Sequence, residues 1–534
     1  MLSSRNNLVL LTYFVVVIGF LTFIPISGHV GPFSFPTSVS ATNIVRHGRI
    51  TLSSSLPAKA YWINMLSVER DYPAPSLLLA MLQIISNIPF DILPFLPISG
   101  FTIFIFYYAI IVEVLYRKDL FRNSLNHLTI LLLIIYDLFN RIHAYYVGRA
   151  SLGAALFIVS VFLILKLFGS NKKKTWIILI MIILVTTSFT YYTSILATAS
   201  IFLLFLITYA TRFLSFDQHT KNAILGLVTL SLFLLSYQPI MSGLLISPSK
   251  FVNNLVAWIL TQLKIEKNTE AFYLNVGNVP IDPFTRVSVV WLGFLFRILS
   301  ILAFVMYLLN RLRNMEKLRI NEPLDTLIII TIGASLAELS YTFQAPTLSL
   351  RFVTMLSVLY FPLMITRIKK IEIKTIANII ISVLLVIFYV GSINSTILYG
   401  NINAPQSLYG FNSFISGITQ PHYSTIIAGD SYYTSYASFK VFLSTGEGRL
   451  HFTILGSYVI YLFSSHENST INAEEFVNHD INYLLLINDG KPISGDPWGY
   501  IIMPSHSSIN FLLHRLEIIY NDEHVYLLSM GNFK

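Results

Sequence analysis

Long apolar runs alternate with short polar junctions along most of this chain. About 20 helical residues cross a hydrocarbon core roughly 30 Å thick, and runs close to that length recur from residue 7 to residue 397. The pattern therefore predicts about eleven transmembrane helices in a mainly α membrane protein. The runs are 7–27, 98–116, 125–141, 150–169, 175–190, 194–210, 222–245, 287–309, 324–343, 351–366 and 375–397.

Two segments depart from this pattern. In 28–97, polar and proline-rich stretches flank SLLLAMLQIIS (76–86), which is too short to span and is predicted to be a helix on the membrane surface or one that dips in and returns. In 398–534, short alternating runs predict strands with helices between them, and therefore one α/β domain. These strand-like stretches are STIIAGD, RLHFTILG, INYLLLIND, WGYIIMP and EIIYNDEHVYLLSM. The predicted domains are 1–397, with a long first loop at 28–97, and 398–534.

Positive charge gathers in alternate junctions. Arg5 and the junctions RKDLFR, NKKK, TRFLSFDQHTK, NRLRNMEKLR and RIKKIEIK hold about half of the 35 lysines and arginines, all on one side if 76–86 does not cross. The rule that cytoplasmic loops are positive then predicts a cytoplasmic N-terminus and an extracytoplasmic C-terminal domain in a cell membrane. An even number of spans is the competing topology. Because this topology accounts for the net charge of +9, no nucleic-acid partner is predicted.

Composition excludes several kinds of chemistry. The chain has no cysteine, so disulfides, thiolate catalysis and cysteine-ligated metals are excluded. The sequence contains no Walker A loop, HExxH or GxSxG motif, and its histidines lack metal-ligand spacing. No cofactor is therefore predicted, and a divalent cation stays open.

Ionisable groups gather on the side opposite the lysine-rich junctions. VERDYPAPS places Glu69, Arg70 and Asp71 together in a chain of which 11% is charged, and Arg149 and Arg351 begin two predicted spans. Carboxylates accept protons from nucleophiles, guanidinium groups bind phosphate, and aromatic rings offer flat apolar surface. This mixture suits a membrane-lipid substrate with a phosphate and a polar head. Further candidates on that side are Asp137, His143, Tyr146, Tyr192 and Glu338.

Each of these groups has a structural alternative. Arg149 and Arg351 can mark span ends by snorkelling to the interface. Residues 69–71 can be a solvated loop before a helix, and Tyr146 and Tyr192 can belong to an interfacial belt of aromatic residues. The residues alone leave these alternatives open.

The chain resembles the membrane-embedded glycosyltransferases of the GT-C type, especially archaeal members that use polyprenyl-phosphate sugars. The resemblance has four parts. A single span precedes a long loop with ATNIVRHGRI, and YPAPSLLLAMLQIIS is similar to the family's Tyr-Pro segment and surface helix. YYVGRASLGAALFIVSVFLILKLF is similar to the span after the second outer loop, and an outer α/β domain ends in VYLLS.

The resemblance implies transfer of a sugar from a polyprenyl-phosphate donor to an acceptor on the outer face, with inversion. A carboxylate in the first outer loop is the family's usual catalytic group, but residues 27–49 hold no acid, and Glu69 is the first one in the loop. Asp71 or Glu69 is therefore the expected base, with Asp137 or Glu338 as alternatives. Arg149, Arg351 and Arg70 would hold the phosphate. A noncatalytic assembly subunit of this fold and a transporter or flippase of lipid-linked substrates remain alternatives, and the acceptor is not identified.

Overall fold

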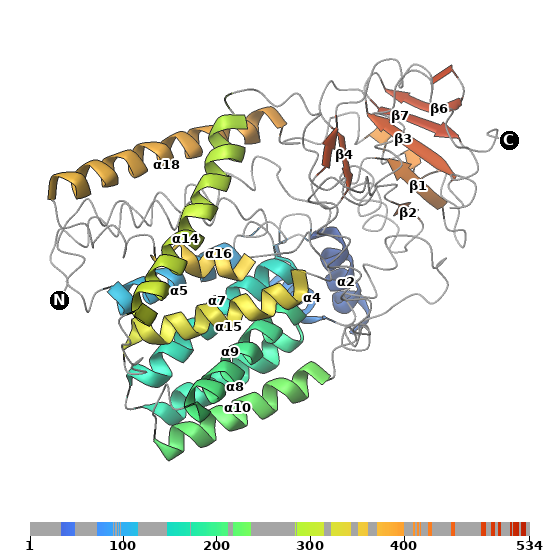
Figure 1. The fold of residues 1–534 in the computed structure, drawn as a ribbon. Coiled ribbons are helices and arrows are strands. Elements are labelled where there is room, and N and C mark those ends of the chain that lie inside the picture. Colours follow the sequence, from blue (N-terminus) through green and yellow to red (C-terminus); the bar gives the residue numbers. More distant parts are fainter. Residues whose placement is uncertain are drawn as a thin grey trace, which may run out of the picture. The chain divides into compact units, whose positions relative to one another are not determined.

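The computed structural model describes a set of helices and two small β-sheets (Figure 1). Contacts divide the chain into two units. The first comprises Met1–Ile24, Pro97–Ala271 and Asp282–Ser395, and the second Pro25–Leu96, Phe272–Ile281 and Thr396–Lys534. The described residues are 34–48, 72–88, 98–115, 147–170, 172–211, 217–236, 286–313, 322–342, 351–360, 371–399, the strands named below and a few single residues or short pieces near them.

The first unit is helical where it is described, and its helices follow the apolar runs of the sequence. The helices are α5 (Ile98–Leu115), α7 (Arg149–Gly169), α8 (Lys173–Ser188), α9 (Tyr192–Ala210), α10 (Gln218–Ser236), the π-helix η7 (Arg286–Trp291), α14 (Leu292–Arg313), α15 (Pro323–Thr342), α16 (Arg351–Ser357) and α18 (Ile371–Tyr399). The predicted runs 7–27 and 125–141 lie outside the described residues.

Four of the described helices are long and apolar enough to cross a membrane. They lie at Arg149–Gly169, Tyr192–Ala210, Gln218–Ser236 and Leu295–Arg313. The prediction of a multi-pass, mainly helical membrane protein is confirmed at this level, while the count of about eleven spans stays a prediction.

The helices of the first unit pack closely against one another. α9 packs against α15, and α7 packs against α5. Lys166 pairs with Glu113 at 2.6 Å, and the rings of Phe162 and Phe106 lie 5.5 Å apart, so α5 and α7 run in the same direction. At Gly333 of α15, an added Cβ would lie 2.7 Å from the Cα of Ile201, so only glycine allows this approach to α9. Small residues allow membrane helices to pack this closely.

In the second unit, two helices pack against each other: α2 (Ser34–His47) and α4 (Ala74–Ser86). The predicted helix at 76–86 is confirmed and begins two residues earlier, because proline is tolerated in the first helical turn. Both helices end in a left-handed residue, Gly48 (φ 65°) after α2 and Asn87 (φ 55°) after α4.

The tail of the chain forms a five-stranded sheet with the order β2-β1-β3-β7-β6 and a two-stranded antiparallel sheet of β4 and β5. β1 pairs in parallel with β2 and β3, and β7 is antiparallel to β3 and β6. Each of the five strand-like stretches of the sequence contains a strand, but β4 was not predicted, because ISGD lacks an alternating apolar pattern. The strands are β1 (Thr425–Gly429), β2 (Leu450–Thr453), β3 (Tyr483–Ile487), β4 (Ile493–Asp496), β5 (Tyr500–Ile502), β6 (Glu517–Asp522) and β7 (Val525–Ser529).

Candidate active site

Four of the predicted site residues lie on described helices of the first unit. Arg149 begins α7, Tyr192 begins α9, Glu338 lies in α15, and Arg351 begins α16, where only its backbone is described. α15 contacts α7, α9 and α16, so the structure gathers these helices in one packed group. Six other candidates lie outside the described residues and stay predictions: Glu69, Arg70, Asp71, Asp137, His143 and Tyr146.

The start of α7 is held by its own third residue. The Ser151 hydroxyl accepts a hydrogen bond from the Gly148 N–H and donates one to the Gly148 carbonyl, both at 2.9 Å. This reciprocal pair does the work of a capping box and holds the first turn in place. Arg149 follows Gly148 and is half-buried. A cation in a first turn opposes the helix dipole, so local preference does not explain an arginine there.

The start of α9 lies against the same end of α7. An added Cβ on Gly153 would lie 2.5 Å from the Cβ of Tyr191 and 2.9 Å from the Ser194 hydroxyl, so α7 meets the α8–α9 junction without an intervening side chain. Tyr192 is only 8% exposed, and its ring lies 5.4 Å from that of Tyr191. This burial disfavours the interpretation of Tyr192 as a belt aromatic facing lipid.

Buried hydroxyl groups collect at this junction, and two of them stand out. Thr187 and Thr190 donate to backbone carbonyls one turn earlier, which satisfies them. The hydroxyls of Thr193 and Ser194, also buried, have no hydrogen-bond partner among the described residues. Unsatisfied buried polar groups are costly and rare, which draws attention to this point of the fold. Sequence reasoning missed both residues, although TTSFTYYTS (186–194) is a run of hydroxyl side chains at the end of an apolar segment.

Glu338 has a defined structural task. Its carboxylate accepts hydrogen bonds from the backbone N–H groups of Phe352, in a short contact, and of Val353 at 2.9 Å. These are the second and third residues of α16, so Glu338 caps that helix from α15. The side chain is 2% exposed. The geometry therefore assigns Glu338 to helix capping, and a direct role with substrate stays a prediction.

The capping site lies beside the second and third turns of α7, away from the start of that helix. The rings of Phe352 and Phe157 lie 4.2 Å apart, and Phe157 follows Arg149 by two turns. At 1.5 Å per helical residue, that places the contact about 12 Å along α7 from Arg149. The helix that Glu338 caps therefore contacts α7 about two turns away from Arg149.

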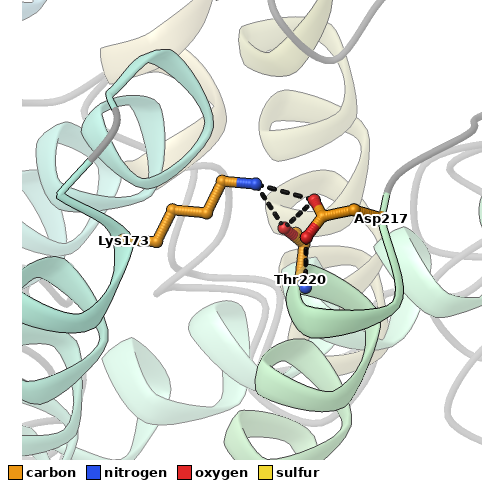
Figure 2. A network of polar contacts seen from close by, with 3 residues as sticks. All are labelled: Lys173, Asp217 and Thr220. Atoms are coloured by element: carbon orange, nitrogen blue, oxygen red, sulfur yellow. Dashed lines mark hydrogen bonds and ion pairs between the residues drawn. The ribbon is translucent and has the colours of Figure 1, made fainter.

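At the opposite end of the unit, where α8 and α10 begin, charged side chains pair with one another. Lys173 of α8 donates to Asp217 at 2.7 Å and to Thr220 of α10 at 2.8 Å, as Figure 2 shows. The Lys173 hydrogen bond, followed by that of Thr220, lowers the pKa of Asp217 below its usual value. The contact places two of the lysine- and arginine-bearing junctions at one end of the unit, as the charge pattern requires.

A metal site does not emerge from the described side chains. Within the described ranges, no three His, Asp or Glu residues come together as ligands would. The acidic candidates Glu69, Asp71 and Asp137 lie outside those ranges, so the binding of a divalent cation stays an open question.

The architecture combines membrane-length helices with a small domain that contains β-sheets. Membrane-length helices form one unit, and a short surface-type helix and a mixed sheet belong to another. The sequence matches no family model, and it matches no curated protein.

Solved structures do show a likeness. The Archaeoglobus fulgidus oligosaccharyltransferase in complex with zinc and sulfate aligns with a TM-score of 0.50 and 11% identity, over 88% of this chain and 68% of its own. An oligosaccharyltransferase from the same organism, AglB, in complex with an inhibitory peptide and a dolichol-phosphate, aligns at 0.48 and 10% identity, over 89% and 69%. Apo ArnT from Cupriavidus metallidurans aligns at 0.48 and 10% identity, over 99% and 98%. The first likeness shows that the chain shares the fold of that oligosaccharyltransferase.

Proposed function

We propose that this protein is a membrane glycosyltransferase that moves a sugar from a polyprenyl-phosphate donor to an acceptor on the outer face of the membrane. The observation that carries the proposal is the fold shared with an oligosaccharyltransferase over 88% of the chain. Most of the chain is thus accounted for by a fold that another protein uses for glycosyl transfer.

Asp71 is the proposed general base, with Glu69 as its alternative. The carboxylate removes the proton from an acceptor hydroxyl as that oxygen attacks the anomeric carbon of the donor. The bond between that carbon and the phosphate oxygen breaks, and polyprenyl phosphate leaves with the bonding electron pair. In-line displacement inverts the anomeric configuration. The side chain of Tyr72, the next residue, is 2% exposed, so the chain just after the acid is anchored in the second unit.

Arg149 and Arg351 are proposed to hold the donor phosphate, with Arg70 beside them. Both Arg149 and Arg351 are the first residue of a helix, where the helix dipole disfavours a cation. A bound phosphate would offset that penalty at α7, because the arginine and the N–H groups of the first turn both favour an anion. The C-terminal domain is proposed to shape the acceptor site.

The test is transfer by the purified protein, with a panel of polyprenyl-phosphate sugars first screened by thermal stabilisation. Asp71→Asn should abolish transfer while donor binding and the unfolding midpoint stay unchanged. Glu69→Gln is the matched control and should retain activity. Full activity of Asp71→Asn with loss in Glu69→Gln would move the role to Glu69, and full activity of both would reject a base in this segment.

The phosphate role has its own control at the lysine-rich end. Arg149→Gln should weaken donor binding by roughly 10- to 100-fold, since a charge-assisted hydrogen bond contributes about 1.5–3 kcal/mol. Arg313→Gln, at an exposed arginine that ends α14, should leave donor binding unchanged. Equal loss in both variants would mean that positive charge in general, and not the start of α7, attracts the donor.

A noncatalytic assembly subunit of the same fold is the second candidate. The observation that favours it is the absence of any acid from α2 and its flanking residues 27–49, where the resemblance leads one to expect the catalytic group. Stabilisation by a donor without transfer to any acceptor tested, in wild type and Asp71→Asn alike, would support this candidate.

A further inference from the structure

Positive charge at the start of α8 exceeds the negative charge around it. Lys172, Lys173 and Lys174 follow one another there, and Lys221 lies in the first turn of α10, which packs against α8. In the described parts of these two junctions, the acidic residue is Asp217, and it pairs with Lys173 at 2.7 Å. The other three lysines form no ion pair among the described residues. Three positive charges are thus left at one end of this helix pair.

The contact shown in Figure 2 brings these charges together. The Lys173 ammonium donates to Asp217 and to Thr220 of α10, so the first turns of α8 and α10 lie side by side. The two lysines next to Lys173 are exposed, and Lys221 follows Thr220 directly in the sequence. Like charges that are held at one place repel one another, and an anion bound among them would offset that repulsion.

An exposed apolar stripe follows Lys174 along α8. Ile178, Met181, Ile182 and Val185 come four, seven, eight and eleven positions later, which is the spacing of one side of a helix. These four side chains are 58%, 44%, 55% and 40% exposed. The side of α8 that bears Lys174 therefore continues as an exposed apolar surface.

Helix α10 repeats this arrangement. Lys221 is followed on the same side by Leu225 and Leu232, which are 51% and 54% exposed. Since α8 and α10 pack against each other, two apolar stripes begin at one group of lysines. A phospholipid has a matching form, because its charged headgroup carries two acyl chains.

We propose that the first turns of α8 and α10 form a binding site for an anionic phospholipid. Lys172, Lys174 and Lys221 hold the headgroup phosphate, and the acyl chains lie along the two stripes. The proposal rests on these described residues and does not depend on the proposed glycosyl transfer.

The position of Trp176 favours a lipid over a soluble anion. Trp176 lies two residues after Lys174 and is half-buried, and tryptophan is enriched at the headgroup level of membranes. The neighbouring lysines are therefore near the lipid phosphates, where each lysine adds to the attraction of an anionic leaflet. A soluble anion would use the lysines and leave the two apolar stripes without a role.

Lipid binding to the purified full-length protein in a neutral detergent tests the proposal. Native mass spectrometry measures how many phosphatidylglycerol and phosphatidylcholine molecules each variant retains across a titration. The Lys172→Gln/Lys174→Gln variant removes two cations, and Lys172→Arg/Lys174→Arg keeps both charges. Arg313→Gln, at an exposed arginine that ends α14, is the control. The unfolding midpoint of each variant is compared with that of wild type.

Wild type should bind phosphatidylglycerol more tightly than phosphatidylcholine. Because one lysine near an anionic lipid surface corresponds to about a fivefold change in affinity, the double Gln variant should lose roughly 20-fold in phosphatidylglycerol affinity. The double Arg variant and Arg313→Gln should bind like wild type. An equal loss in Arg313→Gln, or no preference for phosphatidylglycerol in wild type, would overturn the proposal. If the double Gln variant does not fold, Lys221→Gln replaces it, with an expected loss of about fivefold.

Quenching of Trp176 fluorescence locates the bound lipid. The protein is placed in phosphatidylcholine nanodiscs with brominated lipid, and the signal of Trp176→Phe is subtracted to isolate this residue among the five tryptophans. Quenching should begin at a lower content of brominated phosphatidylglycerol than of brominated phosphatidylcholine, and the double Gln variant should abolish the difference. An unchanged difference in that variant would contradict the site. Displacement of the lipid by inorganic phosphate would identify a soluble anion as the ligand and would also overturn the proposal.

Discussion

The two ends of the helix group α7 to α10 differ in how their polar side chains are paired. Where α7 and α9 end, charges are paired within the chain: Lys166 with Glu113, and Lys173 with Asp217. Where α7 and α9 begin, the buried polar groups include several hydroxyls, and those of Thr193 and Ser194 have no hydrogen-bond partner among the described residues. Self-paired charges hold helices together, whereas unmatched polar groups favour contact with something outside the chain. The comparison supports a proposed site at the end where α7 and α9 begin.

The largest stability effect is expected from Glu338→Ala. Removing the carboxylate leaves the buried N–H groups of Phe352 and Val353 without their acceptor, which should destabilise the protein by about 3 kcal/mol. Thermal unfolding in detergent measures the loss. Glu338→Gln keeps one acceptor oxygen and should lose less. An unchanged midpoint in Glu338→Ala would show that the cap contributes nothing.

The second-largest effect is expected from Gly153 in α7, and Gly226 in α10 is its control. Gly153→Ala places a Cβ against Tyr191 and Ser194 and should cost about 2 kcal/mol, because the α7 contact must open. Gly226→Ala in α10 has nothing within 4 Å and should be neutral or stabilising by up to about 1 kcal/mol. Unfolding midpoints of the two variants should therefore move in different directions. Equal shifts would indicate that helix propensity, and not packing, dominates.

The pair between Lys166 and Glu113 should contribute less. Glu113→Gln leaves Lys166 without its anion. Because the Lys166 side chain is 29% exposed and that of Glu113 is 14% exposed, we expect the free energy of unfolding to fall by about 1 kcal/mol. The double variant Glu113→Gln/Lys166→Met should recover most of the loss, since no unpaired charge remains. Thermal unfolding of the two single variants and the double variant measures the coupling, and purely additive losses would argue against it.

The exposed pair between Lys173 and Asp217 should have the smallest effect and a defined pH dependence. The lowered pKa of Asp217 means that its stabilising contribution is present above the ordinary carboxyl pKa of about 3.9 and is lost as pH falls through the lower folded value. Asp217→Asn should therefore be slightly less stable than wild type at pH 6, and the gap should close on acidification. A gap that widens toward low pH would reverse the sign of this assignment.

Much of the fold could be predicted because its signals are local. The helices α7 to α10 begin and end within a few residues of apolar runs in the sequence, apart from the late part of 222–245, which lies outside the described residues. The interfacial-length helix at 76–86 and the strand pair β6 and β7 could be recognised for the same reason. β4 and the π-helix η7 could not, because ISGD has no alternation and a π-turn leaves no periodicity of its own.

The candidate site was harder to predict than the fold. Arg149 and Tyr192 were identified as residues at span ends, but nothing in the sequence distinguished Thr193 and Ser194 from ordinary hydroxyls. Glu338 was chosen as an acid near a span end, and its capping of α16 depends on a contact with residues fourteen and fifteen positions away. Contacts of this kind leave no repeating pattern in the sequence, so pattern analysis cannot find them.

The sequence by itself determined where most of the described helices form, and it predicts on which side the lysines gather, because helix length and junction charge are properties of consecutive residues. Only the tertiary structure decided that Gly153 admits the α8–α9 junction, that Glu338 is committed to α16, and that α4 buries one arc and exposes another equally apolar one. These outcomes depend on which surfaces meet. In an apolar chain many surfaces are chemically alike, so shape and the pairing of a few polar groups select among them.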